Sequence, residues 1–383
     1  MHVGLNLIFL VPGATGGMEI YARELIGAFM HEAPAFKFTA FVNREFATLP
    51  NTLPSEVKTI VVPVSASNRL AWVAGEQFLL PRLAKRAGVD LLHSLGGTAP
   101  IRGNFRRVIT IHDLHCFVVP EAHFGLRAYG MRFLVPAAAR SAHRIIVDSE
   151  NTAADLRHHL RIDRGKIDVV PLGVEARESD RPLNVGEVRE RFALGHREVL
   201  LTFSAKRPHK NLIRLLQALA LIPAERRPVL VLPGYPTPHE VDLKAEASRL
   251  GLENDTRFLG WIPPEEMETL FALATVFVFP SLHEGFGLPI LEAMARGVPV
   301  CCSNRGAMKE AAGDAALTFD PEDVSAIARA METLLLDRAQ QQKLQLAGRE
   351  RAAMFTWRRT ARATLDAYVA AMDQCALGKR KSP

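Results

Sequence analysis

The chain has 383 residues, of which 48% are hydrophobic and 23% charged, and its formal net charge is +6. This composition is typical of a soluble globular protein, and the length favours two domains over one. The modest positive charge permits an anionic ligand or membrane surface as a partner, but no basic motif interleaved with aromatic residues indicates nucleic acid.

The N-terminal run Val3–Val11 has no basic lead-in and ends in Pro-Gly, so it predicts a first strand rather than a signal peptide. No apolar run reaches the roughly twenty residues that span a bilayer. The cysteines lack the paired spacing of metal ligands and predict reduced thiols, the vicinal pair buried in a strand: Cys116, Cys301, Cys302 and Cys375. We therefore expect a cytoplasmic protein.

Short runs rich in Val, Ile and Leu alternate with longer helical patterns, which predicts parallel sheets built from βαβ units. The strands expected in the first half are Gly4–Leu10, Phe38–Val42, Val57–Val62, Leu91–His93, Val108–Ile111, Arg144–Val147 and Ile167–Val170. Those expected in the second half are Val199–Ser204, Pro228–Leu232, Arg257–Leu259, Val276–Phe279 and Val298–Cys302. Each half is expected to form a doubly wound sheet.

The boundary between the halves is expected in Leu172–Pro182, a charged segment with Gly173 and Pro182 that follows a strand. The C-terminal residues predict two helices, about Ala339–Ala353 and Thr356–Gln374.

The segment Pro280–Glu292 places two carboxylates, Glu284 and Glu292, around a Gly-Phe-Gly turn that runs from a strand into a helix. A glycine turn at a helix N-terminus offers backbone N–H groups and a favourable dipole to a phosphate. Carboxylates accept hydrogen bonds from hydroxyl groups, which are abundant on sugars and riboses. The combination predicts a site for a nucleotide sugar.

A second basic segment, Lys206–Asn211, follows a strand and opens the helix expected over Leu212–Ala220. Cations at a helix N-terminus oppose the helix dipole, so an anionic ligand would explain them. Lys210 and Arg207 are expected to neutralise a diphosphate, although a solvated basic turn is the alternative.

Three further loops are candidates for ligand contact. Gly16 and Gly17 follow the first strand where the helix Met18–Met30 begins, and they would allow close approach of a ligand or form a plain tight turn. His112 ends another strand and could donate to a sugar hydroxyl, or be a structural histidine. Trp261 and Ile262 could wall a nucleobase, or belong to an ordinary loop.

An arginine-rich stretch runs from Arg102 to Arg164 and includes Arg127, Arg132, Arg140 and Arg144. It is either a solvated helix face or a docking surface for an anionic membrane at the inner leaflet.

The chain resembles the family 4, or group 1, retaining glycosyltransferases, most strongly from Phe203 to Pro321. The motif Pro280–Ala295, followed by Gly-Val-Pro-Val, resembles the family's most specific signature, with its two glutamates separated by seven residues. The resemblance implies the GT-B fold, two Rossmann-like domains that face each other across a cleft. Residues 1–175 would bind the acceptor and be joined by the C-terminal helix 355–376, and residues 183–354 would bind the nucleotide sugar.

Position by position, the resemblance implies that Glu284 binds sugar hydroxyls and Glu292 the ribose. The backbone of Gly285, Phe286, Gly287 and Leu288 would cradle the sugar and diphosphate. Lys210 matches the family's diphosphate lysine, and Gly16, Gly17 and His112 match its glycine loop and strand-end histidine. Ala205 stands where many members have an arginine, so Arg207 is expected to take over that contact.

The expected reaction is transfer of a hexose, with retention, from a nucleoside-diphosphate sugar to a saccharide or lipid-linked acceptor. The resemblance implies that the leaving phosphate helps to take the acceptor proton. Neither a cofactor nor a metal is expected. The motif variant resembles the mannosyltransferase branch and favours GDP-mannose, with a UDP-sugar next. Alternatives are a sugar-nucleotide epimerase, a phosphorylase-like enzyme with pyridoxal, and a non-catalytic nucleotide-sugar-binding subunit.

Overall fold

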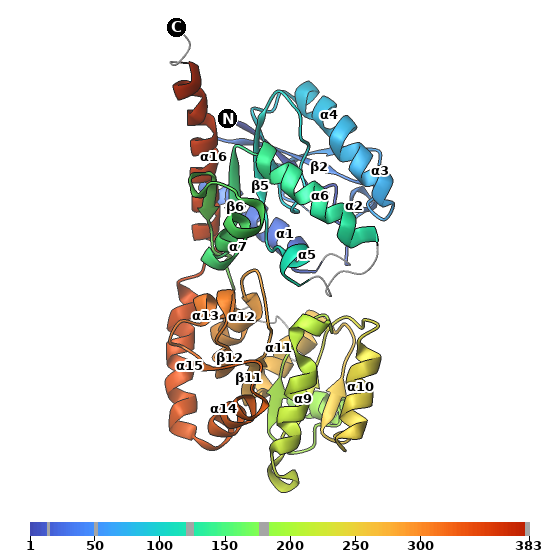
Figure 1. The fold of residues 1–383 in the computed structure, drawn as a ribbon, viewed down its shortest axis with the longest axis vertical. Coiled ribbons are helices and arrows are strands. Elements are labelled where there is room, and N and C mark those ends of the chain that lie inside the picture. The colour runs from blue at the N-terminus through green and yellow to red at the C-terminus, as the bar shows by residue number, and fades with distance from the viewer. Residues whose placement is uncertain (14–15, 50–52, 120–125, 176–183, 380–383) are drawn as a thin grey trace. The chain divides into compact units, whose positions relative to one another are not determined.

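The computed structural model describes residues 1–13, 16–49, 53–119, 126–175 and 184–379, without the side chains of 126–129 and 374–379. The chain divides into two compact units, which we describe separately (Figure 1). Unit 1 comprises the described residues up to Gly173, apart from Val119, together with those from Thr356 onward. Unit 2 comprises Val119 and the described part of Val174–Phe355. Pro182 and most of the segment expected as a linker lie outside the described residues.

Unit 1 is built on a seven-stranded parallel sheet in the order β3-β2-β1-β4-β5-β6-β7. Its strands are β1 His2–Asn6, β2 Lys37–Val42, β3 Lys58–Val61, β4 Leu91–Ser94, β5 Arg106–Thr110, β6 Arg144–Val147 and β7 Ile167–Val169. Its helical segments are α1 Gly17–Glu32, α2 Arg44–Ala47, α3 Arg69–Ala74, the π-helix η1 Gly75–Leu79, α4 Leu80–Ala87, α5 His115–Val118, α6 Leu126–Ser141, α7 Glu150–Leu160, η3 Arg164–Lys166 and α16 Trp357–Lys379.

Unit 2 is built on a six-stranded parallel sheet in the order β10-β9-β8-β11-β12-β13. Its strands are β8 Val199–Leu201, β9 Val229–Leu232, β10 Thr256–Phe258, β11 Val276–Phe279, β12 Val300–Ser303 and β13 Leu317–Phe319. Its helical segments are α8 Val185–Arg191, η4 Pro208–Lys210, α9 Leu212–Leu221, η5 Ala224–Arg226, α10 Glu240–Arg249, α11 Pro264–Leu273, α12 Leu288–Ala295, α13 Gly306–Ala312, α14 Val324–Leu336 and α15 Arg338–Ala353.

The fold class predicted from the sequence is confirmed, because both sheets are parallel and doubly wound. In each sheet the chain adds strands outward on one side and then returns to add strands on the other. The strand order therefore reverses between β1 and β4 in unit 1 and between β8 and β11 in unit 2. Open parallel sheets bind ligands at the carboxyl ends of strands beside such a reversal.

The first strand ends earlier than predicted: the Leu7 amide still donates to the Phe41 carbonyl of β2, but from Ile8 the chain turns into a loop. Ile8 and Leu10 are fully buried, but side chains satisfy the backbone of this segment. Asn43 donates to the carbonyl oxygens of Ile8 and Leu10 at 3.0 and 2.6 Å, and Asn6 accepts from the Ile8 amide at 3.3 Å. A continuous apolar run cannot distinguish a strand from such a buried loop.

Apolar faces of the helices cover the sheets. On α9, Leu212, Leu215, Leu216 and Leu219 are buried in one cluster with sheet residues such as Leu200. Burial of each leucine stabilises the fold by roughly 1.5–3 kcal/mol. The cysteine prediction is confirmed for the vicinal pair, which is fully buried in β12. No helix in the described ranges is both long enough and apolar enough to cross a bilayer.

The last helix, α16, packs in unit 1 against α1, β5 and β6 (Figure 1). Its Tyr368 is fully buried and its hydroxyl lies 2.7 Å from Nδ1 of His93, whose Nε2 lies 2.8 Å from the Thr110 hydroxyl. Burial lowers the pKa of His93 to about 3, so this ring is neutral and structural. The polar network joins residues that are 275 positions apart in the chain.

Glu76 is a second buried polar group in unit 1 and lies in the π-helix η1. Its Oε1 accepts from Asn6, at the end of β1, and from Thr98, which follows β4, both at 3.0 Å. Burial raises the pKa of Glu76 to about 7, against the effect of these hydrogen bonds. The carboxyl group thus joins two loops at the carboxyl edge of the sheet.

We predict that Glu76→Gln changes how stability depends on pH. The folded protein holds the Glu76 proton up to about pH 7, whereas an unfolded chain releases it near 4.5, so stability falls as pH rises between these values. Glutamine mimics the protonated acid and removes this loss, which is worth up to about 3 kcal/mol at pH 8. Thermal melts at pH 5 and pH 8 should show that the melting temperature of the variant, relative to that of the wild type, is higher at pH 8 than at pH 5.

The exposed Glu225→Gln provides the control for loss of one formal charge. A Glu76→Gln variant whose difference from the wild type is the same at both pH values would contradict the assignment.

Candidate active site

The loops that follow β8 and β11 lie beside the strand reversal of unit 2 and contain most of the residues selected from the sequence. The turn η4 ends at Lys210, and Asn211 begins α9 in the left-handed conformation, with φ of 59°. Asparagine is among the few residues other than glycine that adopt this conformation readily. The turn therefore delivers Lys210 to the carboxyl edge of the sheet.

The side chain of Asn211 fixes this turn to two other loops. Its Nδ2 donates to the carbonyl oxygen of Pro280, after β11, at 3.0 Å and to that of Pro321, after β13, at 2.7 Å. The Leu282 amide also donates to the His209 carbonyl at 2.8 Å. Since Asn211 is only 4% exposed, these bonds are protected from water, and the lysine turn and glutamate loop are held in register.

Lys210 and Glu284 contact each other directly. The Lys210 Nζ donates to Oε1 of Glu284 at 2.6 Å, and the side chains are 16% and 11% exposed. The ammonium also lies 5.6 Å from the ring centroid of Phe279. The structure thus brings together the cation selected for a diphosphate and the carboxylate selected for sugar hydroxyls.

The segment after Glu284 leads into α12 through Gly285 and Gly287. Gly287 has φ of 106°, which favours glycine, and it caps the helix. The Phe286 ring is buried against Phe355, at 5.8 Å between centroids, so its side chain anchors the turn. Leu288 begins α12, and Glu292 lies half-buried on the same helix.

Arg207 starts the η4 turn with a half-buried side chain, and among the described residues no ion pair involves it. In the loop after β10, Trp261 is 60% exposed and Ile262 is half-buried. These two residues thus leave much of their surface accessible at the carboxyl edge of β10.

Gly16, Gly17 and His112 lie in unit 1. Gly16 has φ of 55° and precedes α1, and a Cβ atom at either glycine would meet no atom within 4 Å. Ala14 and Thr15 of this loop lie outside the described residues. His112 follows β5, where its Nδ1 lies 2.7 Å from Oδ2 of Asp148 and its Nε2 lies 3.2 Å from the Leu95 carbonyl oxygen.

The buried pair of His112 and Asp148 was not recognised from the sequence. Burial opposes protonation of His112, but the charge and hydrogen bond of Asp148 outweigh it and raise the pKa of the imidazole. Burial also raises the pKa of Asp148, whose Oδ1 is buried with no hydrogen-bond partner among the described residues. Tyr21 packs edge-on against the His112 ring at 4.7 Å and restricts its orientation. The sequence signal was the position of Asp148 directly after β6.

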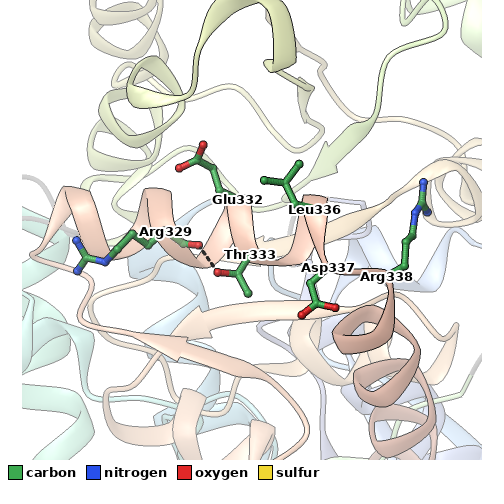
Figure 2. A pocket seen from close by; sticks show the side chains of 6 residues that line it. All are labelled: Arg329, Glu332, Thr333, Leu336, Asp337 and Arg338. Atoms are coloured by element: carbon green, nitrogen blue, oxygen red, sulfur yellow. Dashed lines mark hydrogen bonds between the residues drawn. The ribbon is translucent and has the colours of Figure 1, made fainter.

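Figure 2 shows a groove elsewhere in unit 2, lined by Arg329, Glu332, Thr333, Leu336, Asp337 and Arg338. These side chains project in different directions from α14 and the start of α15, and none was selected as a site residue. Within the described ranges, no three His, Cys, Asp or Glu side chains form a group that could hold a metal ion.

Two doubly wound parallel-sheet units with polar loops at their strand reversals are the elements of the GT-B fold, which solved glycosyltransferase structures share. The family model "Glycosyl transferases group 1" matches residues 187–351, and "Glycosyltransferase Family 4" matches residues 15–178. WaaG, a glycosyltransferase involved in lipopolysaccharide biosynthesis, has a similar fold, with a TM-score of 0.74, 17% identity and coverage of 96% of this chain and 99% of WaaG.

O-antigen chain mannosyltransferase B of Escherichia coli is 34% identical over 266 residues, which are 69% of this chain and 70% of that protein. The MMP alpha-(1->4)-mannosyltransferase of Mycolicibacterium hassiacum is 31% identical over 254 residues, or 65% of this chain and 59% of that protein. The chain therefore belongs to the family 4, group 1 glycosyltransferases. It is a mannosyltransferase-like hexosyltransferase of glycan biosynthesis.

We predict that Asp148→Asn lowers the pKa of His112, because asparagine lacks the charge that favours the protonated ring. The measurement is the pH titration of the His112 ring signals by NMR. Asp155→Asn, which removes a carboxylate from α7 in the same unit, should have a smaller effect. An unchanged His112 titration in Asp148→Asn would show that the two groups do not interact as the geometry indicates.

Proposed function

We propose that this hexosyltransferase moves mannose from GDP-mannose to a hydroxyl group of a saccharide or lipid-linked saccharide, with retention at the anomeric carbon. The observation that carries the proposal is the contact between Lys210 and Glu284 beside the strand reversal of unit 2. The mannosyltransferases of Escherichia coli and Mycolicibacterium hassiacum support the choice of sugar.

In the proposed reaction the bond between the anomeric carbon and the diphosphate breaks, and the acceptor oxygen bonds to the same face of that carbon. The acceptor proton passes to a phosphate oxygen of the leaving group. Lys210, Arg207 and the N-terminus of α12 stabilise the negative charge that develops on the diphosphate. Glu284 releases Lys210 and accepts hydrogen bonds from sugar hydroxyls, while Glu292 accepts from the ribose.

The backbone of Gly285, Phe286, Gly287 and Leu288 lies between the two glutamates and supports the diphosphate. In unit 1, His112 donates from Nε2 to the donor sugar when that nitrogen gives up the Leu95 carbonyl oxygen at 3.2 Å. The open space around Gly16 and Gly17 lets the protein backbone approach the ligand closely. Trp261 and Ile262 contact the nucleobase. No metal is required because these cations and helix dipoles neutralise the phosphates, so the transfer rate should be unchanged by excess EDTA.

Donor identity is tested by calorimetric titration with GDP, UDP, ADP and TDP, and by transfer assays with GDP-mannose and UDP-glucose. GDP and GDP-mannose should be preferred. Binding of none of the four nucleotides would refute the donor site. Conversion of donor without any acceptor would instead support an epimerase, and tight donor binding without turnover would support a non-catalytic subunit.

We predict that Lys210→Met weakens GDP binding, whereas Glu284→Gln does not. Lys210→Met loses the charge that stabilises the leaving diphosphate, so turnover should fall by about a hundredfold or more and GDP should bind more weakly. Glu284→Gln frees Lys210 from its carboxylate partner, so GDP should bind as well as to the wild type or better. Because an amide oxygen accepts hydrogen bonds from sugar hydroxyls more weakly than a carboxylate does, turnover of GDP-mannose should nevertheless fall.

The matched control is Glu246→Gln, which removes a carboxylate that pairs with Arg249 on α10 of the same unit. Its turnover should stay close to that of the wild type. Equal loss of GDP affinity in Lys210→Met and Glu284→Gln would contradict the separate assignments.

We also propose a membrane contact, on a surface formed by α3, η1 and α4 of unit 1. Leu70 and Phe78 are 84% and 64% exposed, and the basic residues Arg82, Lys85 and Arg86 follow on α4. Apolar side chains next to cations suit the interface of an anionic membrane. The arginine-rich stretch offers less, because Arg144 is held by Asp168. The side chain of Arg127 lies outside the described residues.

We predict that the protein sediments with vesicles of phosphatidylglycerol but not of phosphatidylcholine. Leu70→Ser combined with Phe78→Ser should reduce the bound fraction severalfold, because the apolar contact is lost. Leu346→Ser, which alters a leucine on α15 of unit 2 that is 65% exposed, close to the exposure of Phe78, is the control and should bind as the wild type does. Sedimentation that depends neither on lipid charge nor on the double substitution would exclude this surface as the membrane contact.

A further inference from the structure

Lys206 is a buried lysine that plays no part in the reaction described above. It lies in the loop after β8, four residues before Lys210, and is only 1% exposed. Its Nζ donates to the carbonyl oxygens of Gly234 and Leu259, both at 2.8 Å, and lies 3.3 Å from Oε2 of Glu240. An ammonium group has three donors, and these three acceptors use all of them.

The acceptors of Lys206 belong to the loops after two neighbouring strands. Gly234 follows β9, and Leu259 follows β10, so the ammonium joins the carboxyl ends of β8, β9 and β10, which are adjacent in the sheet. The hydroxyl of Thr237 also donates to the backbone carbonyl of Lys206. These bonds form a single cross-link among three loops.

Close backbone packing makes the cross-linked arrangement intolerant of change. The Gly234 amide donates to the Gly260 carbonyl at 3.0 Å, and the Ser204 amide donates to the Pro233 carbonyl at 3.3 Å. Gly234 has φ of 132°, and a Cβ atom on it would lie 2.1 Å from the Ser204 carbonyl oxygen. The three loops therefore have little freedom to adjust their spacing independently.

A buried ammonium is a costly way to hold loops together. Burial lowers the pKa of Lys206, and Glu240 only partly opposes this effect. Where packing alone is needed, an apolar side chain of similar volume is often equally stable or more stable. The lysine therefore contributes something that an apolar residue cannot, namely directed bonds to carbonyl groups of two separate loops.

The tethered loops present the surfaces suited to a nucleobase. Tyr235 is 40% exposed in the β9 loop, and Trp261 is 60% exposed in the β10 loop, next to the exposed backbone of Gly260. A base is flat and apolar, with polar edges, so its recognition depends on the spacing of such faces to within about 0.5 Å.

We infer that Lys206 is a positioning residue that fixes the spacing of the nucleobase loops and thereby sets the enzyme's preference among donor nucleotides. The inference rests on the proposed function, because it takes the carboxyl edge of unit 2 as the donor site. It also separates two neighbouring cations: Lys210 acts on the phosphates, whereas Lys206 has no donor left for them.

The test compares nucleotides with inorganic pyrophosphate, a probe that has phosphates but no base. GDP, UDP, ADP and pyrophosphate are titrated calorimetrically into the wild type and Lys206→Met. The variant should bind the preferred nucleotide about tenfold more weakly or worse and lose most of its discrimination among bases, equivalent to at least about 1.4 kcal/mol. Its pyrophosphate affinity should change by less than about twofold, since the phosphate contacts are intact.

Arg227→Met is the matched control. Arg227 also bonds two backbone carbonyls, those of Ala220 and Ile222, and a carboxylate, that of Asp255, but it precedes β9 and so lies at the opposite edge of the sheet. This variant should lose stability while keeping both nucleotide affinity and base preference.

Thr237→Val keeps the inference testable if Lys206→Met fails to fold. It removes one bond between the β9 loop and the Lys206 carbonyl, and it should reduce base preference severalfold without affecting pyrophosphate. Unchanged base preference in the substituted protein would overturn the inference, and so would a parallel loss of pyrophosphate binding. A wild type that binds no nucleoside diphosphate would overturn the proposed function together with this inference.

Discussion

The amide group of Asn211 is the contact on which the geometry of unit 2 depends. It bonds to carbonyl oxygens that follow β11 and β13, while its own left-handed backbone ends the turn that follows β8. Together with the Leu282 amide, which donates to the His209 carbonyl, it brings Lys210 to Glu284, on a loop 74 residues away in the chain. Lys206 makes the corresponding link on the other side, to the loops after β9 and β10. Two adjacent segments of one loop thus organise the carboxyl ends of five strands.

These links hold the loops of the site rigidly, whereas a few side-chain contacts can be replaced by a ligand. Backbone carbonyls are poor partners to lose in a buried setting, so the bonds of Asn211 and Lys206 persist. The contact of Lys210 with Glu284 is different, because both partners can exchange it for a contact with a ligand. A phosphate can replace Glu284 as the acceptor for Lys210, and a sugar hydroxyl can replace Lys210 as the donor to Glu284. In unit 1, His112 has a comparable support in Asp148 and the Leu95 carbonyl.

Much of the fold follows from the sequence, because buried parallel strands are continuous apolar runs such as Val276–Phe279. The edge strand β13, Leu317–Phe319, was missed because it is short and its central threonine is exposed. The site motifs were recognisable from local spacing around Lys210 and Glu284. Their supports were not, because Asn211 finds its partners 69 and 110 residues away and an isolated amide carries no local signal of such contacts.

The return of α16 to unit 1 sets the order in which the two units can complete their folding during synthesis. His93 acquires the buried hydroxyl partner of its Nδ1 only when Tyr368 has been synthesised, after all of unit 2. The ribosome releases the whole of unit 2 before that helix, so unit 2 can fold as a finished body while unit 1 still lacks a wall. The half of the protein that is encoded first is therefore the half that is completed last.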